Sequence, residues 1–166
     1  MGLPAGMMGS DKCTALTHPD LLATEDFEHI GGDKFLIPSG DMSSCVFYGR
    51  WDAETGPRGT VPAGGIFLLD VSTKPATVSP VPIKGFPEDI FFLGHGSYYS
   101  NATQQFYVVN HGFAQGGERV IIFKVHQDPV ISVEYIRSVT SNLFGHVQLN
   151  DVVEGDIHMS IDTHLL

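Results

Sequence analysis

Short apolar runs alternate with turns of glycine, proline and polar residues along most of the chain. The runs are rich in valine, isoleucine, phenylalanine and tyrosine, which is typical of β-strands. No long stretch keeps the 3.6-residue apolar period of an amphipathic helix. The pattern therefore predicts an all-β fold. The expected strands cover residues 27–30, 34–37, 65–71, 77–81, 96–100, 105–110, 120–125, 133–139 and 157–161.

Turn residues divide these strands into units. Glycines and Asp33 at 31–33 and polar residues at 101–104 are expected to be tight turns, and residues 49–65 a Gly/Pro-rich loop. The prolines around the 77–81 strand favour an edge position. Four strands in about 45 residues is the spacing of one β-propeller blade. Single helical turns are expected only at 19–22 and 141–144.

Three polar pairs each precede a strand-like run: Glu25-Asp26, His95-Gly96 and Asn150-Asp151. The pairs are 70 residues apart (95 − 25) and then 55 apart (150 − 95). This spacing suggests a repeated β unit that returns the chain to one place. In a propeller, the first strand of each blade lines the central channel, where carboxylate and amide oxygens would suit calcium.

A simpler interpretation of these pairs stays open. Aspartate, asparagine and glycine are common at turns before strands, where the aspartate and asparagine side chains bond the backbone.

Adjacent residues on a strand point to opposite faces, which bears on how such pairs would bind ions. Glu25 and Asp26 would then serve two different ions, or one ion and the local backbone, and the same holds for Asn150 and Asp151.

Two of the eight histidines have a distinctive context. His95 lies between two glycines, and His111 follows a strand-like apolar run. A pair of imidazoles near bound calcium would suit general-base chemistry at neutral pH, although structural or exposed histidines fit the same positions. The sequence contains no Gly-x-Ser-x-Gly, no Gly-rich phosphate loop with lysine and no His-Glu-x-x-His. This disfavours serine hydrolases and nucleotide-binding proteins.

The composition further limits what kind of protein this is and which partners it has. The 166 residues suit one domain, and 42% hydrophobic with 17% charged residues argues against disorder. A net charge of −10 argues against nucleic acid and anionic membranes as partners. No secretion signal is visible, and residues 1–12 are expected to be a flexible lead-in. Cys13 and Cys45 are separate thiols or a disulfide, which spacing cannot decide. Asn101 begins a glycosylation sequon.

The chain resembles the paraoxonases, calcium-dependent arylesterases and lactonases with a six-bladed β-propeller. The similarity covers residues 13–155 and resides in Glu-Asp, His-Gly, Val-Asn-His and Asn-Asp motifs in register. The segments that carry it are 24–28, 65–70, 95–97, 107–111 and 149–153. The resemblance implies that residues 13–166 form the N-terminal half of such a propeller, up to about three blades.

The resemblance also implies two calcium ions and a set of site residues. The positions of Glu25 and Asn150 bind a catalytic calcium. Those of Asp26 and Asp151, with a backbone carbonyl at Ser97, bind a structural calcium. His95 and His111 match a proposed base dyad. Cys13 matches a cysteine that closes the family's propeller.

Further consequences of the resemblance concern location and completeness. It implies an extracellular or membrane-associated glycoprotein that acts on small esters or lactones. Lipid or lipoprotein association would use an apolar N-terminal segment that is missing here. The family's remaining calcium ligands and the partner of Cys13 come from later blades that this chain does not contain. A partial sequence is therefore expected.

Two function classes follow. The first is an ester or lactone hydrolase, with a gluconolactonase-like protein as the alternative among calcium lactonases. The second is a non-catalytic propeller fragment that binds calcium or serves as an interaction module.

Overall fold

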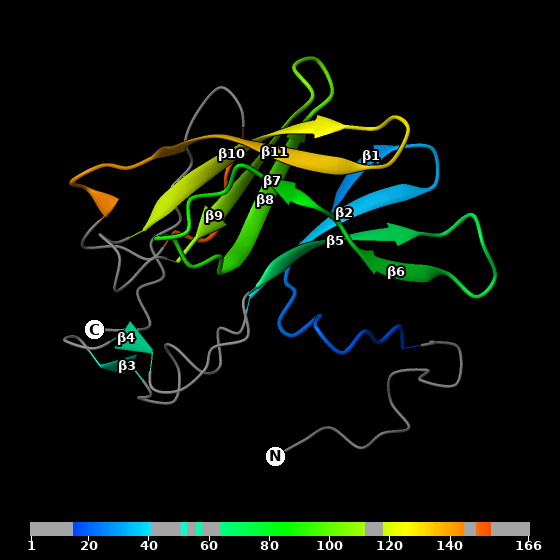
Figure 1. The fold of residues 1–166 in the computed structure, drawn as a ribbon, viewed down its shortest axis with the longest axis horizontal. Helices are drawn as coiled ribbons and strands as arrows, with labels where there is room; N and C mark the ends of the chain where they lie inside the picture. Colours follow the sequence, from blue (N-terminus) through cyan, green and yellow to red (C-terminus); the bar gives the residue numbers. More distant parts are fainter. Residues whose placement is uncertain are drawn as a thin grey trace.

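The computed structural model describes residues 15–40, 51–52, 56–57, 64–111, 118–144 and 149–153, and within them the regular elements are β-strands. The first sheet is an antiparallel meander in the order β1-β2-β5-β6 (Figure 1). Its strands are β1 (Glu28–Gly31), β2 (Lys34–Ser39), β5 (Gly65–Asp70) and β6 (Thr77–Pro80). The predicted all-β class is therefore confirmed.

The second sheet has the order β7-β11-β10-β9-β8. Its last four strands in the chain form an antiparallel meander, and β7 pairs in parallel with β11 at the outer edge. The strands are β7 (Ile83–Lys84), β8 (Gly94–Ser100), β9 (Gln105–Asn110), β10 (Arg119–His126) and β11 (Ser132–Val139). Within the described residues neither sheet closes on itself.

The boundaries of most observed strands agree with those expected from the sequence to within one to three residues. The 77–81 strand was expected at an edge, and β6 lies at the edge of its sheet. The prediction of a loop over 49–65 was wrong in part, because β3 (Trp51–Asp52) and β4 (Gly56–Pro57) pair there in a small hairpin. The two-residue β7 was not predicted.

The expected turns are also present. Gly31 and Gly32 adopt positive φ angles of 115° and 58°, which a side chain would strain, and so reverse the chain between β1 and β2. Phe144 N donates to Ser141 O over 2.9 Å, as expected of a single turn, and the sequon at Asn101 lies in the exposed β8–β9 turn. Residues 149–153 contain no strand, and the predicted run at 157–161, residues 1–12, Cys13 and Cys45 lie outside the described residues.

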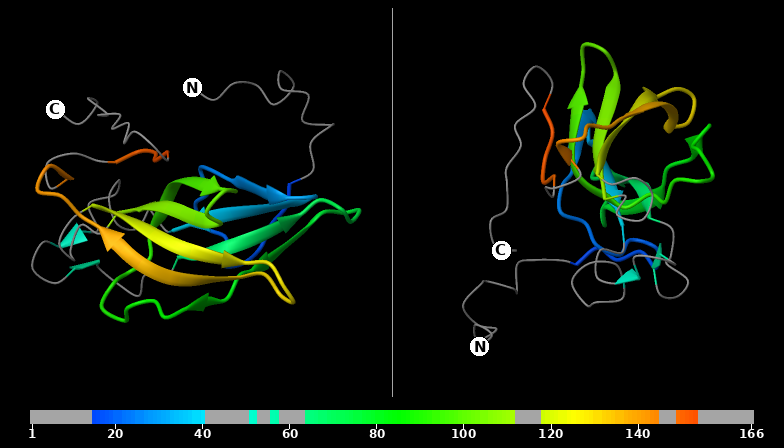
Figure 2. Two further views of the ribbon diagram at one scale, coloured as in Figure 1. Left: turned by 90° about the horizontal axis from the view of Figure 1, so that it is seen from above. Right: turned by 90° about the vertical axis from the view of Figure 1, so that its left-hand side faces the viewer.

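The hydrophobic core lies between the two sheets, because both contribute to one buried cluster. The central strand β10 is buried along most of its length, which explains its continuous apolar run. Both β1 and β2 contact β8, so the first two strands of the first sheet lie beside the edge strand that begins the meander of the second (Figure 2). The core residues from the first sheet are Ile30, Leu36 and Ile66, and those from the second include Phe106, Val108, Ile121, Phe123, Val125 and Val133.

This core placement predicts different costs for two nearby valines. Val133 is fully buried, whereas Val130 is 67% exposed. Replacing Val133 with alanine should lower the free energy of unfolding by about 2 kcal/mol, since it removes buried methyl groups and leaves a cavity. Val130→Ala, the matched control, should change it by less than about 0.5 kcal/mol. Urea denaturation measures both, and equal effects would contradict this core.

Candidate functional site

Two carboxylates bind the outer edge of β8. Asp26 Oδ2 accepts hydrogen bonds from Ser97 N (2.8 Å) and Ser97 Oγ (3.1 Å), and Glu28 Oε2 accepts one from Tyr99 N (3.3 Å). β8 is an edge strand of its sheet, so these alternate amides point away from β9. The side chains of Asp26 and Glu28 therefore satisfy donors that a neighbouring strand would otherwise take.

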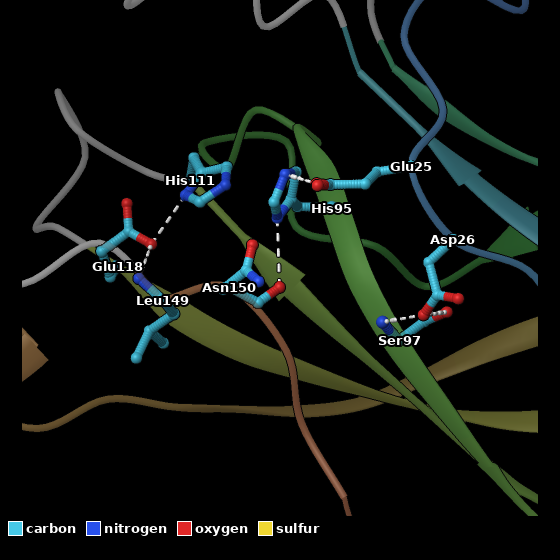
Figure 3. Close-up of polar contacts among 8 residues, drawn as sticks. All are labelled: Glu25, Asp26, His95, Ser97, His111, Glu118, Leu149 and Asn150. Carbon is cyan, nitrogen blue, oxygen red and sulfur yellow. Dashed lines mark hydrogen bonds and ion pairs between the residues drawn. The ribbon is translucent and has the colours of Figure 1, made fainter. Parts of the chain in front are cut away.

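His95 joins the first and third polar pairs. Its Nε2 makes an ion-pair contact with Glu25 Oε2, and its Nδ1 lies 3.1 Å from the backbone carbonyl of Asn150 (Figure 3). The side chain of His95 is 15% exposed and that of Glu25 is 57% exposed. Both ring nitrogens face oxygen acceptors, so the two contacts are satisfied together only when both nitrogens carry protons.

A close backbone approach places residues 149–153, the third segment, which contains the third polar pair, against β8. A Cβ atom on Gly96 would lie 2.1 Å from the carbonyl oxygen of Asn150 and 2.8 Å from the Cα atom of Asp151. Only glycine allows this approach without displacement. Leu149 and Val152 are buried in a cluster with Val109, which anchors the segment on its other side.

His111 lies beside His95 but is fully buried. The two ring centroids are 4.8 Å apart, with an interplanar angle of 57°. His111 Nδ1 is 2.7 Å from Oε2 of the buried Glu118. That oxygen also accepts a hydrogen bond from Leu149 N over 3.2 Å. One carboxylate oxygen thus contacts both the imidazole and the third segment (Figure 3).

Asn110 fixes the chain at the start of β8. Its Oδ1 accepts from Leu93 N (2.6 Å) and its Nδ2 donates to Phe91 O (3.1 Å), while the next backbone amide, His111 N, donates to Leu93 O (3.1 Å). The Asn110 side chain is fully buried. The two histidines are therefore positioned by one shared set of backbone contacts.

Negative charge is concentrated on the Glu28 side of the site. Partial burial raises the pKa of Glu28 above its ordinary value, and the negative charges of Asp26 and Asp151 raise it further, against the lowering effect of the Tyr99 hydrogen bond. Carboxylates gathered in this way are expected to attract a cation.

The predicted site residues thus come together, while their roles stay predictions. Glu25 faces His95 and Asp26 faces Ser97, two residues further along β8. Ser97, expected to offer a carbonyl, contacts Asp26 through its N–H and hydroxyl groups. The turn interpretation also applies, because Phe27 N donates to Asp26 Oδ1 (2.8 Å) and Val152 N to Asp151 Oδ1 (2.7 Å).

These oxygen donors fit calcium by their chemistry, since carboxylate, amide and backbone oxygens are its usual ligands. They lie at two levels, with Glu25 and the Asn150 segment beside His95, and Asp26 beside Ser97. Across the described ranges, no group of three or more His, Cys, Asp or Glu side chains is arranged to hold a metal ion.

Three residues of this site were not predicted from sequence. Glu28 shares a strand face with Asp26 at i and i+2, so the alternation was an available signal. Glu118 carried no such signal, because its position opposite His111 depends on the register of β9 and β10. Asn110 was part of a recognised motif, but its buried hydrogen bonds are visible only in the fold.

No protein-family model matches the chain, and no curated protein matches it. In the described part of the chain, no helix is long and apolar enough to cross a membrane.

The approach at Gly96 gives a direct structural prediction. Gly96→Ala should displace residues 149–151 from β8 and lower the free energy of unfolding by about 1–3 kcal/mol, because the methyl group meets backbone atoms. Gly65→Ala is the control, since its Cβ would meet only the Phe67 ring at an ordinary 3.4 Å. Amide chemical shifts of 149–153 and urea denaturation measure the effects. Unchanged shifts in Gly96→Ala would refute this close approach.

The raised pKa of Glu28 predicts how the free energy of unfolding depends on pH when divalent cations are absent. A carboxyl group with a raised folded pKa binds its proton more tightly in the folded chain, so its contribution falls as pH rises from 4.5 through the folded pKa. Glu28→Gln keeps an acceptor for Tyr99 N but cannot ionise. The gain in free energy of unfolding of Glu28→Gln over the parent should therefore be larger at pH 7 than at pH 4.

Urea denaturation at the two pH values measures this difference. Glu88→Gln serves as the control, because Glu88 is an exposed glutamate. A Glu28→Gln variant whose relative stability is the same at both pH values would show that the Glu28 pKa is not raised.

Proposed function

We propose that this chain is a calcium-dependent hydrolase of small esters or lactones, of the paraoxonase type, built as part of a six-bladed β-propeller. The observation that carries the proposal is the position of His95, which contacts Glu25, the Asn150 carbonyl and the His111 ring. A proton-transfer group is thus surrounded by the oxygen donors that calcium prefers.

The arrangement of the sheets supports the propeller architecture. Two successive antiparallel meanders place the segment that leads into β1 beside β8, and the Asn150 segment also lies against β8. Four-stranded meanders of this kind are the unit of a propeller, and their first strands line its centre. The contacts of Asp26 with Ser97 and of Glu28 with Tyr99 join the start of one meander to the first strand of the next, across 71 residues.

Residues of two levels would hold the calcium ions. Glu25 and Asn150 are assigned to the catalytic ion, and Asp26, Asp151 and the Ser97 carbonyl to the structural ion. When bound, the catalytic calcium would polarise the substrate carbonyl and stabilise its oxyanion. In its neutral form, the partly exposed His95 would take a proton from the attacking water through Nε2, if Glu25 holds the calcium instead of this ring nitrogen. The buried His111 supports the orientation of the His95 ring.

A second candidate function is a non-catalytic calcium-binding or interaction module. The hydrogen bonds of Asp26 and Asp151 to neighbouring backbone amides favour it, because these carboxylates tie the chain together without any reaction. In this case the acidic site would bind a cation, while His95 would serve as a structural ion-pair partner of Glu25.

Hydrolysis of phenyl acetate by the 166-residue chain distinguishes the two functions. We expect activity with calcium and its loss with excess chelator. His95→Gln and His111→Gln should each lower kcat/KM by about 10²-fold or more, the usual contribution of general-base catalysis. His126→Gln, which removes an exposed histidine paired with Glu134, should change it less than twofold.

Hydrolysis that persists in excess chelator would reject the calcium-dependent mechanism. A folded chain that binds calcium, measured by titration calorimetry, but hydrolyses neither phenyl acetate nor a lactone would favour the binding module.

A further inference from the structure

The buried carboxylate of Glu118 lies behind His111. Strands β9 and β10 pair Arg119 with Asn110, so continuing the antiparallel register by one residue places Glu118 opposite His111 (119 + 110 = 118 + 111). Glu118 is 3% exposed and His111 is fully buried. A buried carboxylate is costly unless hydrogen-bonded, so a position this deep needs a reason.

Two donors meet at one oxygen of this carboxylate. His111 Nδ1 is 2.7 Å from Glu118 Oε2, and Leu149 N donates to the same atom over 3.2 Å. A carboxylate oxygen only accepts, so the Nδ1 proton of His111 points at Glu118. In the neutral ring this leaves Nε2 as the nitrogen that exchanges a proton.

The contact with Leu149 reaches the other side of the site. The residue after Leu149 is Asn150, whose carbonyl lies 3.1 Å from His95 Nδ1. Glu118 is therefore linked to His95 by two routes: through the His111 ring, 4.8 Å from that of His95, and through the backbone of residues 149–150 (Figure 3).

We propose that Glu118 is a positioning residue that sets the Nδ1–H tautomer of His111 and holds the Leu149-Asn150 segment against His95. The proposal deepens the hydrolase proposal and rests on it for its effect on catalysis. Carboxylates that orient a histidine through its other nitrogen act in this way in many sites.

A matched pair of variants tests the role. Glu118→Gln keeps the size and one acceptor oxygen but removes the charge, and we expect kcat for phenyl acetate to fall by about 10-fold to 100-fold with KM changed less than about twofold. Glu134→Gln makes the same change in an exposed Glu–His pair, with His126 Nε2 at 3.0 Å, and should alter neither constant. An unchanged kcat in Glu118→Gln would overturn the positioning role.

A spectroscopic measurement on the unmodified chain needs neither activity nor a variant that folds. Long-range ¹H–¹⁵N NMR of the histidine rings should show neutral His111 with its proton on Nδ1. A proton on Nε2 would overturn the proposal. If the parent chain hydrolyses no ester, the hydrolase proposal fails, and the tautomer still decides whether Glu118 orients His111.

Discussion

The acidic residues at the start of the first sheet satisfy the edge of the second. β8 ends its sheet, and its outward amides at Ser97 and Tyr99 are bonded by the carboxylates of Asp26 and Glu28. These contacts join residues 71 positions apart and fix the path of the chain before β1. Glu25 then reaches His95 because it is the residue before Asp26.

This arrangement has an electrostatic cost that is relevant to function. The pKa of Glu28 is raised by burial and by nearby negative charge, so the site favours groups that neutralise it. A proton or a divalent cation can each do so. The same features that join the two sheets therefore make the place suitable for a cation, and the structural and catalytic interpretations share their residues.

The third segment is held by shape rather than by charge. Gly96 leaves room for the backbone of Asn150 and Asp151, while Leu149 and Val152 are buried next to β9 and β10. Glu118 adds the polar contact that ties this segment to His111. The two histidines thus lie where three distant parts of the chain meet, and both glutamate side chains and backbone carbonyls contact them.

The strands were predictable because alternation and turn residues are local signals. The contact of His95 with both Glu25 and the Asn150 segment agrees with the expectation that the three polar pairs return to one place. β7 was not predictable, since two residues carry no periodicity. Glu118 was missed because one residue of strand register decides whether it faces His111.

The close approach of the Asn150-Asp151 segment to β8 is tested most directly by nuclear Overhauser contacts in the 166-residue chain. The account predicts a contact between the α protons of Gly96 and Asp151, alongside cross-strand contacts between Ser97 and Val108. A spectrum that shows the Ser97–Val108 contacts but none between Gly96 and Asp151 would contradict it.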